Sequence, residues 1–294
     1  MAGAEGTVVA AFGRHYEVQF ADGRCVRAFP RGKKSEIAVG DVVALDADGG
    51  DGAQILEHRP RTSLLYRSDA YRQKLIAANV SQIVLVGAAE PAIHDLLLSR
   101  AIVAAEAESI GVVIVLNKID LADKVEAARA ILAPFAALGY RIVEICAKRD
   151  VTALDSLLHN EASVLVGQSG MGKSSIINAL LPGTGAATRE ISAALDSGKH
   201  TTTHARMYGL PAGGKLIDCP GLQEFGLAHL GFGQIEQGFI EFRPYLGHCR
   251  FRDCRHGSEP DCAVREAVQA GRIDARRYRH FSVLVGESAK HNRF

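Results

Sequence analysis

A glycine-rich stretch in the second half of the chain carries the residue types that hold phosphate groups. Its glycines let backbone N–H groups turn toward phosphate oxygens, at a helix N-terminus where negative charge is favoured. Lys173 adds a positive charge on the same oxygens, and the hydroxyl of Ser174 can ligate Mg²⁺. The pattern predicts a nucleotide-binding P-loop. The residues assigned to it are Gly167, Gln168, Ser169, Gly170, Met171, Gly172, Lys173, Ser174 and Ser175.

The segments on either side of this loop have the composition that a P-loop requires. Residues 162–166 form an apolar, strand-like run, and residues 175–181 form a helix-like run. A flexible surface turn is the alternative interpretation. A complete pattern between a strand and a helix favours phosphate binding.

A second set of polar residues follows the apolar run 112–116 and predicts which base is bound. A carboxylate held rigidly at Asp120 could accept from guanine N1–H and N2–H₂ together, whereas adenine offers no such donor pair. Asn117 could bond the base and the loop backbone, and the stem of Lys118 could lie along the base. Alternatively, Asp120 caps the following helix. One strand later, a backbone N–H could meet guanine O6 in the triplet Cys146, Ala147 and Lys148.

Two segments after the P-loop could sense the γ-phosphate. Asp218 ends a strand-like run and could hold Mg²⁺ through water, and the N–H of Gly221 could meet the γ-phosphate. The polar residues 186–204 predict an order–disorder switch in which one threonine closes onto Mg²⁺. We assign this role to Thr202, although the sequence does not decide among Thr201, Thr202 and Thr203.

The residue that should orient the attacking water is missing from its usual place. Ras-like GTPases use a glutamine just after the motif that ends in Gly221, but this chain has Leu222, which cannot orient water. His200 is the nearest titratable candidate and His204 the weaker rival; a solvent-exposed loop histidine is the alternative. We expect slow turnover by the free enzyme, with catalytic roles for His200, Lys173 and Thr202.

A cysteine-rich segment near the C-terminus predicts a structural zinc site. Three thiolates and one imidazole are a common tetrahedral ligand set for zinc, and a closed set leaves no position for catalysis. Buried thiols beside a surface histidine are the alternative. Half of the chain's six cysteines fall in this short segment, which chance rarely produces. The expected ligands are Cys249, Cys254, His256 and Cys262.

The elements that must position these residues follow from the pattern of apolar runs. Residues 83–86, 112–116, 141–147 and 163–166 are expected as strands, and the first two as buried parallel strands. Helices are expected at 94–109 and 122–137. This alternation predicts an α/β sheet with its ligands at the carboxyl ends of the strands.

The first 60 residues have a different texture, with short strand-like runs separated by glycine turns. Runs at 8–10, 15–20, 25–28 and 41–45 predict a small β-barrel, for which an OB-fold is the natural candidate. The polar residues 65–74 are expected as a connection. Five basic residues without an acidic one lie between positions 24 and 34, and this run is either a solvated loop or a contact for RNA phosphates. They are Arg24, Arg27, Arg31, Lys33 and Lys34.

The C-terminal segment is also basic. Residues 250–294 hold ten Lys/Arg against six Asp/Glu, with arginines clustered on an expected helix. This could be a solvated face or an RNA surface beside the zinc site. The arginines in question are Arg272, Arg276, Arg277 and Arg279.

Composition and charge place few limits on function. The 294 residues suggest two or three domains, and 47% hydrophobic with 23% charged residues is ordinary for a globular protein. A net charge of +1 neither supports nor excludes nucleic acid. No apolar run reaches 18 residues and no basic-then-apolar signal opens the chain, so we expect a cytoplasmic protein with no membrane partner and reduced cysteines.

The order of the nucleotide motifs is unusual. In Ras-like GTPases the P-loop comes first, but here the guanine motifs at 117–120 and 146–148 precede it, which makes the domain circularly permuted. A barrel, this permuted order and the Cys-x₄-Cys-x-His-x₅-Cys spacing together resemble the bacterial small-ribosomal-subunit biogenesis GTPases, the RsgA family. The resemblance covers essentially the whole chain. Cys146 stands where serine is common, and the C-terminal end is short.

The resemblance implies a multidomain α/β protein with three parts. These are an OB-fold RNA-binding domain at 1–64, a circularly permuted P-loop GTPase domain at 65–228 and a mainly helical zinc-binding domain at 229–294. It further implies a GTPase that the small ribosomal subunit stimulates and that acts late in the maturation of that subunit. The resemblance also implies that His200 is the residue that orients the attacking water. We expect GTP and GDP, Mg²⁺ and one zinc per chain as ligands, with the small subunit and its rRNA as partners of a monomer.

Two other classes of function remain open. An ATP-using enzyme such as a small kinase would share the P-loop, but Asn117 and Asp120 argue against it. An RNA-binding module with a merely structural nucleotide would hydrolyse almost no GTP even with ribosomal subunits present.

Overall fold

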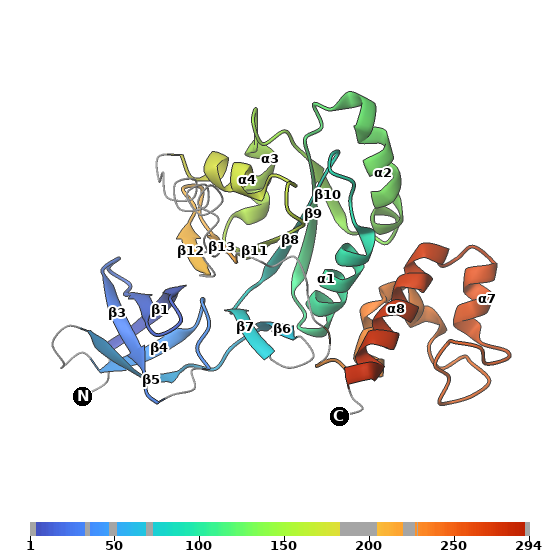
Figure 1. Cartoon of the computed structure of the whole chain (residues 1–294), viewed down its shortest axis with the longest axis horizontal. Helices are drawn as coiled ribbons and strands as arrows, with labels where there is room; N and C mark the ends of the chain where they lie inside the picture. Colours follow the sequence, from blue (N-terminus) through green and yellow to red (C-terminus); the bar gives the residue numbers. More distant parts are fainter. Residues whose placement is uncertain are drawn as a thin grey trace.

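The structure, a computed structural model, describes residues 4–32, 36–46, 52–68, 73–182, 205–219, 227 and 229–291. In Figure 1 the N-terminal barrel lies on the left, an α/β part in the centre and a helical part on the right. Two members of the basic run, Lys33 and Lys34, lie outside the described residues. Among the helices that are described, none combines the length and apolar content that a membrane crossing requires.

The N-terminal strands close into the expected OB-like barrel. Their order around the barrel is β1-β2-β3-β5-β4, and β4 returns to pair with β1. Neighbours are antiparallel except β3 and β5, which run parallel. Val8, Val18 and Leu45 point inward and are fully buried. The strands are β1 (Ala4–Ala11), β2 (Tyr16–Gln19), β3 (Cys25–Pro30), β4 (Val42–Asp46) and β5 (Ala53–His58).

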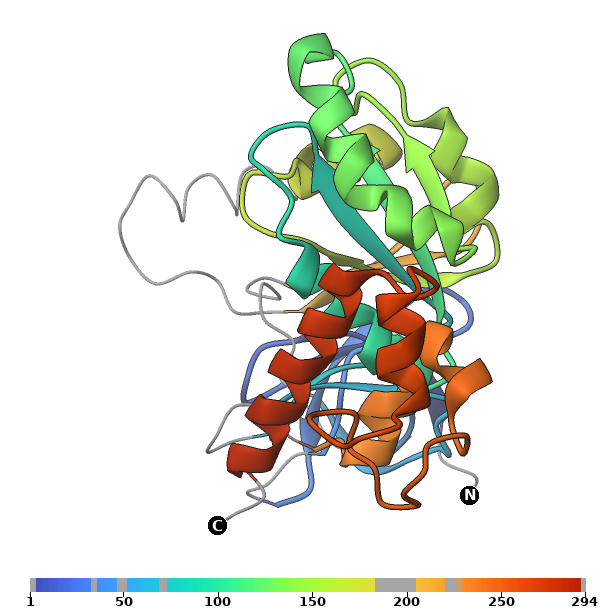
Figure 2. The same cartoon turned by 90° about the vertical axis from the view of Figure 1, so that its right-hand side faces the viewer.

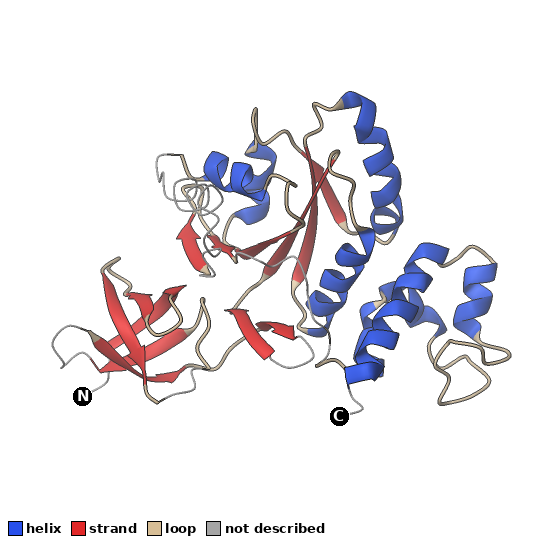
Figure 3. Ribbon diagram, viewed as in Figure 1, coloured by secondary structure: helices blue, strands red, loops and turns tan. Residues whose placement is uncertain are grey.

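The central part is an α/β sheet flanked by helices (Figure 3), and its strands follow the order β10-β9-β8-β11-β13-β12 (Figure 1). The first five of these strands are parallel, and β12 is antiparallel to β13. Every residue of β8 is buried, as expected for a parallel strand covered on both faces. The strands are β8 (Gln82–Ala88), β9 (Gly111–Asn117), β10 (Arg141–Glu144), β11 (Ala162–Val166), β12 (Arg206–Gly209) and β13 (Lys215–Asp218).

Helices cover both faces of this sheet. Ile83 of β8 shares a core with Ile102 of α1, whereas its neighbour Val84 shares a core with Ile176 of α4. Adjacent strand residues point to opposite faces, so one apolar run supplies both cores. The helices are α1 (Asp95–Ala107), α2 (Ala122–Ala137), α3 (Thr152–Leu158) and α4 (Lys173–Leu180).

The barrel and the sheet are joined along their edges. Ala10 of β1 pairs with Arg206 of β12, and the N–H of Ala11 donates to the carbonyl of Ala205 at 3.2 Å. Arg206 also lies 3.7 Å from the carboxylate of Glu17 on β2. The start of β12, the strand that follows the expected switch segment, is therefore paired with the barrel strand β1.

A hairpin occupies most of the segment that was expected to be a polar connection. It consists of β6 (Leu64–Ser68) and β7 (Gln73–Ala78), which pair antiparallel. The expectation was wrong because Leu65 and Ile76 are buried, while the polar residues between them obscure the apolar alternation. Ala77 bridges to Val39, so the hairpin is attached to the barrel side.

The C-terminal part is helical and packs on α1, as Figures 1 and 2 both show. Its centre is aromatic: the rings of Phe242 and Phe281 lie 4.9 Å apart, and those of Phe239 and Phe281 lie 5.5 Å apart. Its elements are α6 (Phe232–Gly238), the 3₁₀ helix η1 (Ile240–Tyr245), α7 (Ala263–Gln269) and α8 (Ala275–His291).

The arginine cluster of this part is not one continuous solvated face. Arg272 precedes α8, and Arg277 is only 1% exposed. The guanidinium of Arg277 donates to Glu241 at 2.7 Å and to the hydroxyl of Ser99 at 2.8 Å, and it lies over the ring of Phe239. Arg277 therefore ties α8 to η1 and α1.

Because the carboxylate of Glu241 would be left buried and unpaired, Arg277→Ala should lower the free energy of unfolding by about 3–5 kcal/mol. Arg279→Ala is the matched control, since Arg279 is exposed on the same helix and should change stability by about 0.5 kcal/mol or less. Urea unfolding of both variants is the measurement. Equal midpoints for the two variants would contradict the structural role of Arg277.

Candidate nucleotide site and metal centre

The predicted P-loop lies between β11 and α4, and its glycines are needed for the path of the backbone. Gly170 and Gly172 have positive φ angles of 79° and 91°. A Cβ on Gly167 would lie 2.3 Å from the carbonyl oxygen of Val86, so β8 packs too closely for a side chain there. Ser169 is exposed in the loop, and Ser174 and Ser175 are half-buried in the first turn of α4.

Lys173 and Asp218 face the same partly buried space at the carboxyl ends of β11 and β13. The ammonium of Lys173 donates to the carbonyls of Gly167 at 2.6 Å and Gln168 at 2.7 Å. Burial lowers the pKa of Lys173, and the nearby Asp218 carboxylate opposes this shift. Burial likewise raises the pKa of Asp218, opposed by Lys173. Phosphate and a divalent cation would favour the charged form of each group.

Asn117 connects the P-loop to both segments predicted to read the base. Its side chain is buried at the end of β9 with 2% exposure. The amide nitrogen donates to the carbonyl of Met171 at 2.9 Å, and the amide oxygen accepts from the N–H of Ala147 at 3.0 Å. One amide group thus holds together three loops that are far apart in the sequence.

Asp120 is exposed beside Cys146. The thiol of Cys146 donates to a carboxylate oxygen of Asp120 at 3.2 Å, and this hydrogen bond is the main cause that lowers the pKa of Asp120. Asp120 does not cap the following helix, because the N-cap of α2 is Leu121 and no side chain caps it. Lys148 is exposed in the turn after Cys146.

The segment 90–94, which was not expected at the site, lies between the P-loop and the base loop. Lys118 has a positive φ of 61°, and its ammonium donates to the carbonyl of Glu90 at 2.7 Å. The amide oxygen of Gln168 accepts from the N–H of His94 at 3.0 Å. The available signal was position alone: this segment directly follows β8 at the ligand-binding edge of the sheet.

The remaining predicted residues of the nucleotide site lie outside the part of the chain that the structure describes. These are His200, Thr201, Thr202, Thr203, His204, Gly221 and Leu222.

The four predicted metal ligands converge. None of the six cysteines forms a disulfide, and the ligand atoms of Cys249, Cys254, His256 and Cys262 lie within 4.8 Å of one another. Nδ1 of His256 is 3.3 Å from the sulfur of Cys262 and 3.6 Å from the other two sulfurs. The sulfurs of Cys249 and Cys262 are 3.9 Å apart. Zinc bonded at about 2.3 Å to sulfur and 2.0 Å to nitrogen gives tetrahedral edges of roughly 3.5–3.8 Å. These four separations therefore fit zinc, whereas the widest pair of ligand atoms, up to 4.8 Å apart, exceeds a tetrahedral edge.

Burial disfavours the charged thiolate form of the cysteines at this site. It raises the pKa of Cys254 to about 12 and also raises the pKa of Cys262. Thiolates in such surroundings need a nearby positive charge, which a bound zinc ion would supply. The backbone of His256 is also fixed. Its φ angle is 58°, and its carbonyl oxygen accepts a hydrogen bond from the hydroxyl of Tyr278.

The fold and the order of these loops define a class of protein, the circularly permuted P-loop GTPases. Two solved structures are similar over nearly the whole chain. The YjeQ crystal structure from Thermotoga maritima has a TM-score of 0.77 and 29% identity, and covers 97% of this chain and 98% of its own. The circularly permuted GTPase YloQ has a TM-score of 0.69 and 26% identity, and covers 98% and 95%.

The comparison of sequences is more specific. The family model for the RsgA GTPase matches residues 58–228. Small ribosomal subunit biogenesis GTPases from Burkholderia pseudomallei strain 1710b and Ralstonia pickettii strain 12J are 50% and 49% identical; the alignments cover 98% and 97% of this chain and 93% of each relative. The chain belongs to the RsgA family of small ribosomal subunit biogenesis GTPases. It is therefore a hydrolase acting on GTP, and membership implies GTP, GDP and Mg²⁺ as ligands.

Gly172→Ala tests the connection through Asn117. A Cβ on Gly172 would lie 2.3 Å from the amide nitrogen of Asn117, so this amide must move and lose its buried hydrogen bonds. We expect GDP affinity to fall by about 10- to 100-fold. Gly139→Ala is the matched control, because Gly139 also has a positive φ of 89° but no atom within 4 Å of its Cβ position.

Binding of a fluorescent GDP analogue would measure both variants. Gly139→Ala should cost about 1–2 kcal/mol of stability and leave GDP affinity unchanged. Equal GDP affinities for Gly172→Ala and Gly139→Ala would show that the amide of Asn117 does not hold the site.

Proposed function

We propose that this GTPase binds the small ribosomal subunit and assists a late step in its maturation, hydrolysing GTP to GDP and phosphate as it does so. Its strongest support is that Asn117 joins a P-loop to a base loop with an exposed Asp120, in a chain of the RsgA family. The names of the curated relatives supply the link to the small subunit. Because that process takes place in the cytoplasm, we propose a cytoplasmic location.

The proposed roles in nucleotide binding follow the three loops. Asp120 reads the donor edge of guanine, Lys118 lies along the base, and the backbone of 146–148 meets O6. The P-loop N–H groups and Lys173 hold the phosphates. Ser174 and Thr202 would ligate Mg²⁺, and Asp218 would hold it through water; the bound ion would supply positive charge to neutralise the phosphates.

Catalysis is proposed to depend on a partner. With Leu222 in place of a water-positioning glutamine, His200 is the side chain that we assign to orient the attacking water. Lys173 stabilises the charge on the transferred phosphoryl group, and Gly221 contributes its N–H to the γ-phosphate. The rate should therefore be low in the free enzyme and rise when the subunit is bound.

The barrel is proposed to contact rRNA. Phe29 is 43% exposed on β3, and the rings of Phe12 and His15 stack at 4.8 Å in the adjoining β1–β2 turn. Phe12 and His15 are half-buried, so Phe29 is the exposed ring of this group, and such a ring near basic side chains suits the bases and phosphates of single-stranded RNA. Arg24 is already paired with Asp22 at 2.7 Å, so Arg27 and Arg31 are better candidates for phosphate contacts.

The remaining parts of the proposal concern the metal and the organisation of the chain. The C-terminal site is proposed to hold one zinc, supported by the convergence of three cysteine sulfurs and one imidazole nitrogen within 4.8 Å of one another. We divide the monomer into a barrel domain at 1–64, a GTPase domain at 65–228 and a zinc domain at 229–294. Two observations support this division: the last barrel strand ends at His58, and the family match spans 58–228.

Single-turnover GTP hydrolysis with purified small subunits tests the function. Subunits should raise the wild-type rate by about 10²-fold or more, and excess ATP should not compete with GTP. His200→Ala should still bind GTP and subunits but lose most of this stimulation, whereas the neighbouring variant His204→Ala should keep it. Lys173→Ala should instead lose affinity for GTP.

Each failure has a separate meaning. If small subunits do not stimulate the wild type, the ribosomal function is wrong. If His200→Ala is stimulated as strongly as the wild type, another group orients the water. Equal competition by ATP would contradict guanine recognition by Asp120.

A further inference from the structure

The two ring nitrogens of His256 face different groups. Nδ1 lies among the three cysteine sulfurs at 3.3–3.6 Å. Nε2 points the other way and lies 2.6 Å from a carboxylate oxygen of Glu236. The imidazole is only 3% exposed, and the rings of Phe232, Phe242 and Phe281 surround it at 6.1–6.3 Å. The orientation of the imidazole ring is therefore fixed by the sulfurs near Nδ1 and by the carboxylate near Nε2.

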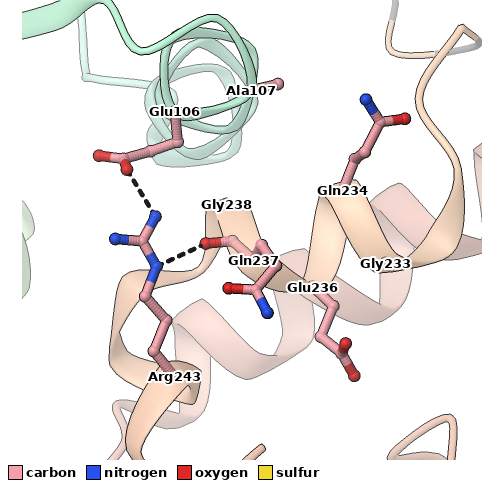
Figure 4. Close-up of a pocket in the computed structure, with 8 residues that line it drawn as sticks. All are labelled: Glu106, Ala107, Gly233, Gln234, Glu236, Gln237, Gly238 and Arg243. Atoms are coloured by element: carbon pink, nitrogen blue, oxygen red, sulfur yellow. Dashed lines mark hydrogen bonds and ion pairs between the residues drawn. The ribbon is translucent and has the colours of Figure 1, made fainter.

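Glu236 does not belong to the cysteine segment. It lies on α6, 20 residues before His256 in the sequence, with its side chain 18% exposed. Figure 4 shows the Glu236 side chain pointing away from Arg243, which reaches Glu106 on α1 at 2.6 Å. The segment formed by α6 and η1 therefore makes contacts in two directions. Arg243 of η1 contacts α1 of the GTPase domain, and Glu236 of α6 contacts the metal ligand His256.

We propose that Glu236 is a positioning residue of the metal centre that acts through His256. This inference rests on the proposed zinc site. When Glu236 accepts a hydrogen bond from Nε2–H, the ring is held in the tautomer that leaves the lone pair of Nδ1 for the metal. The carboxylate also makes the imidazole a stronger electron donor. Glu236 is not needed as a ligand itself, because the three sulfurs and Nδ1 already supply the four donors that a tetrahedral zinc site takes.

The position of Glu236 makes the metal centre depend on the packing of α6 against the GTPase domain. A Cβ on Gly238, two residues further along α6, would lie 2.9 Å from the side chain of Val103 on α1. This close approach fixes α6 on α1, and α6 in turn fixes the carboxylate that faces His256. The cysteine loop is thus connected to the GTPase domain through the hydrogen bond between Glu236 and His256.

The test is zinc affinity, measured on the full chain by competition with a chelator whose colour reports free Zn²⁺. Glu236→Ala should weaken zinc binding by about 10- to 100-fold. Glu236→Gln should restore most of this loss, because its amide oxygen can still accept from Nε2–H. Gln237→Ala, the next residue on the same helix, is the control and should bind zinc like the wild type.

A second background separates orientation of the imidazole from a general effect on folding. His256→Cys replaces the imidazole with a fourth thiol, so Glu236 has no ring to orient. In that background Glu236→Ala should leave zinc affinity unchanged. An equal loss of affinity in both backgrounds, or no loss in the wild-type background, would overturn the role of Glu236. A wild-type chain that binds no zinc would overturn the proposed zinc site and this inference with it.

Discussion

The buried amide of Asn117 is the contact on which the nucleotide site depends. Its two hydrogen bonds reach the carbonyl of Met171 and the N–H of Ala147, so the phosphate loop and both base loops share one fixed point. A buried amide that loses a partner costs about 1–3 kcal/mol, which makes independent movement of these loops unfavourable. The absence of a side chain at Gly172 leaves the space that the Asn117 amide occupies.

Because the domain is circularly permuted, Asn117 comes before the P-loop in the sequence. Parallel strands bring Asn117 and the P-loop to one edge of the sheet, although β9 precedes the loop by 50 residues. Two described residues that follow Asp218 in the sequence contact the β6–β7 hairpin. The thiol of Cys219 donates to the carbonyl of Ile76, and the ring of His229 lies 5.1 Å from that of Tyr66. The residues just after β13 and those at the start of the helical part thus both contact the hairpin that follows the barrel.

The sequence predicted those features of the fold and the site whose signal lies in a short, continuous stretch of residues. The P-loop, the motif at 117–120 and the spacing of the cysteines are short patterns, and the apolar residues 83–86 predicted a buried parallel strand. The hairpin at 64–78 was missed because polar residues obscure its alternation. The burial of Arg277 and the contact of Glu236 with His256 depend on packing between distant segments, and a charged residue on an amphipathic helix gives no sign of such a partner.

We propose that Asp120, held beside Cys146 and joined through Asn117 to the P-loop, selects guanine. The most direct measurement is the affinity of Asp120→Asn for GTP and for xanthosine triphosphate. An amide presents a donor where xanthine presents an acceptor, so the variant should lose GTP affinity and bind xanthosine triphosphate more tightly than GTP. A variant that retains the wild-type preference for GTP would contradict the account.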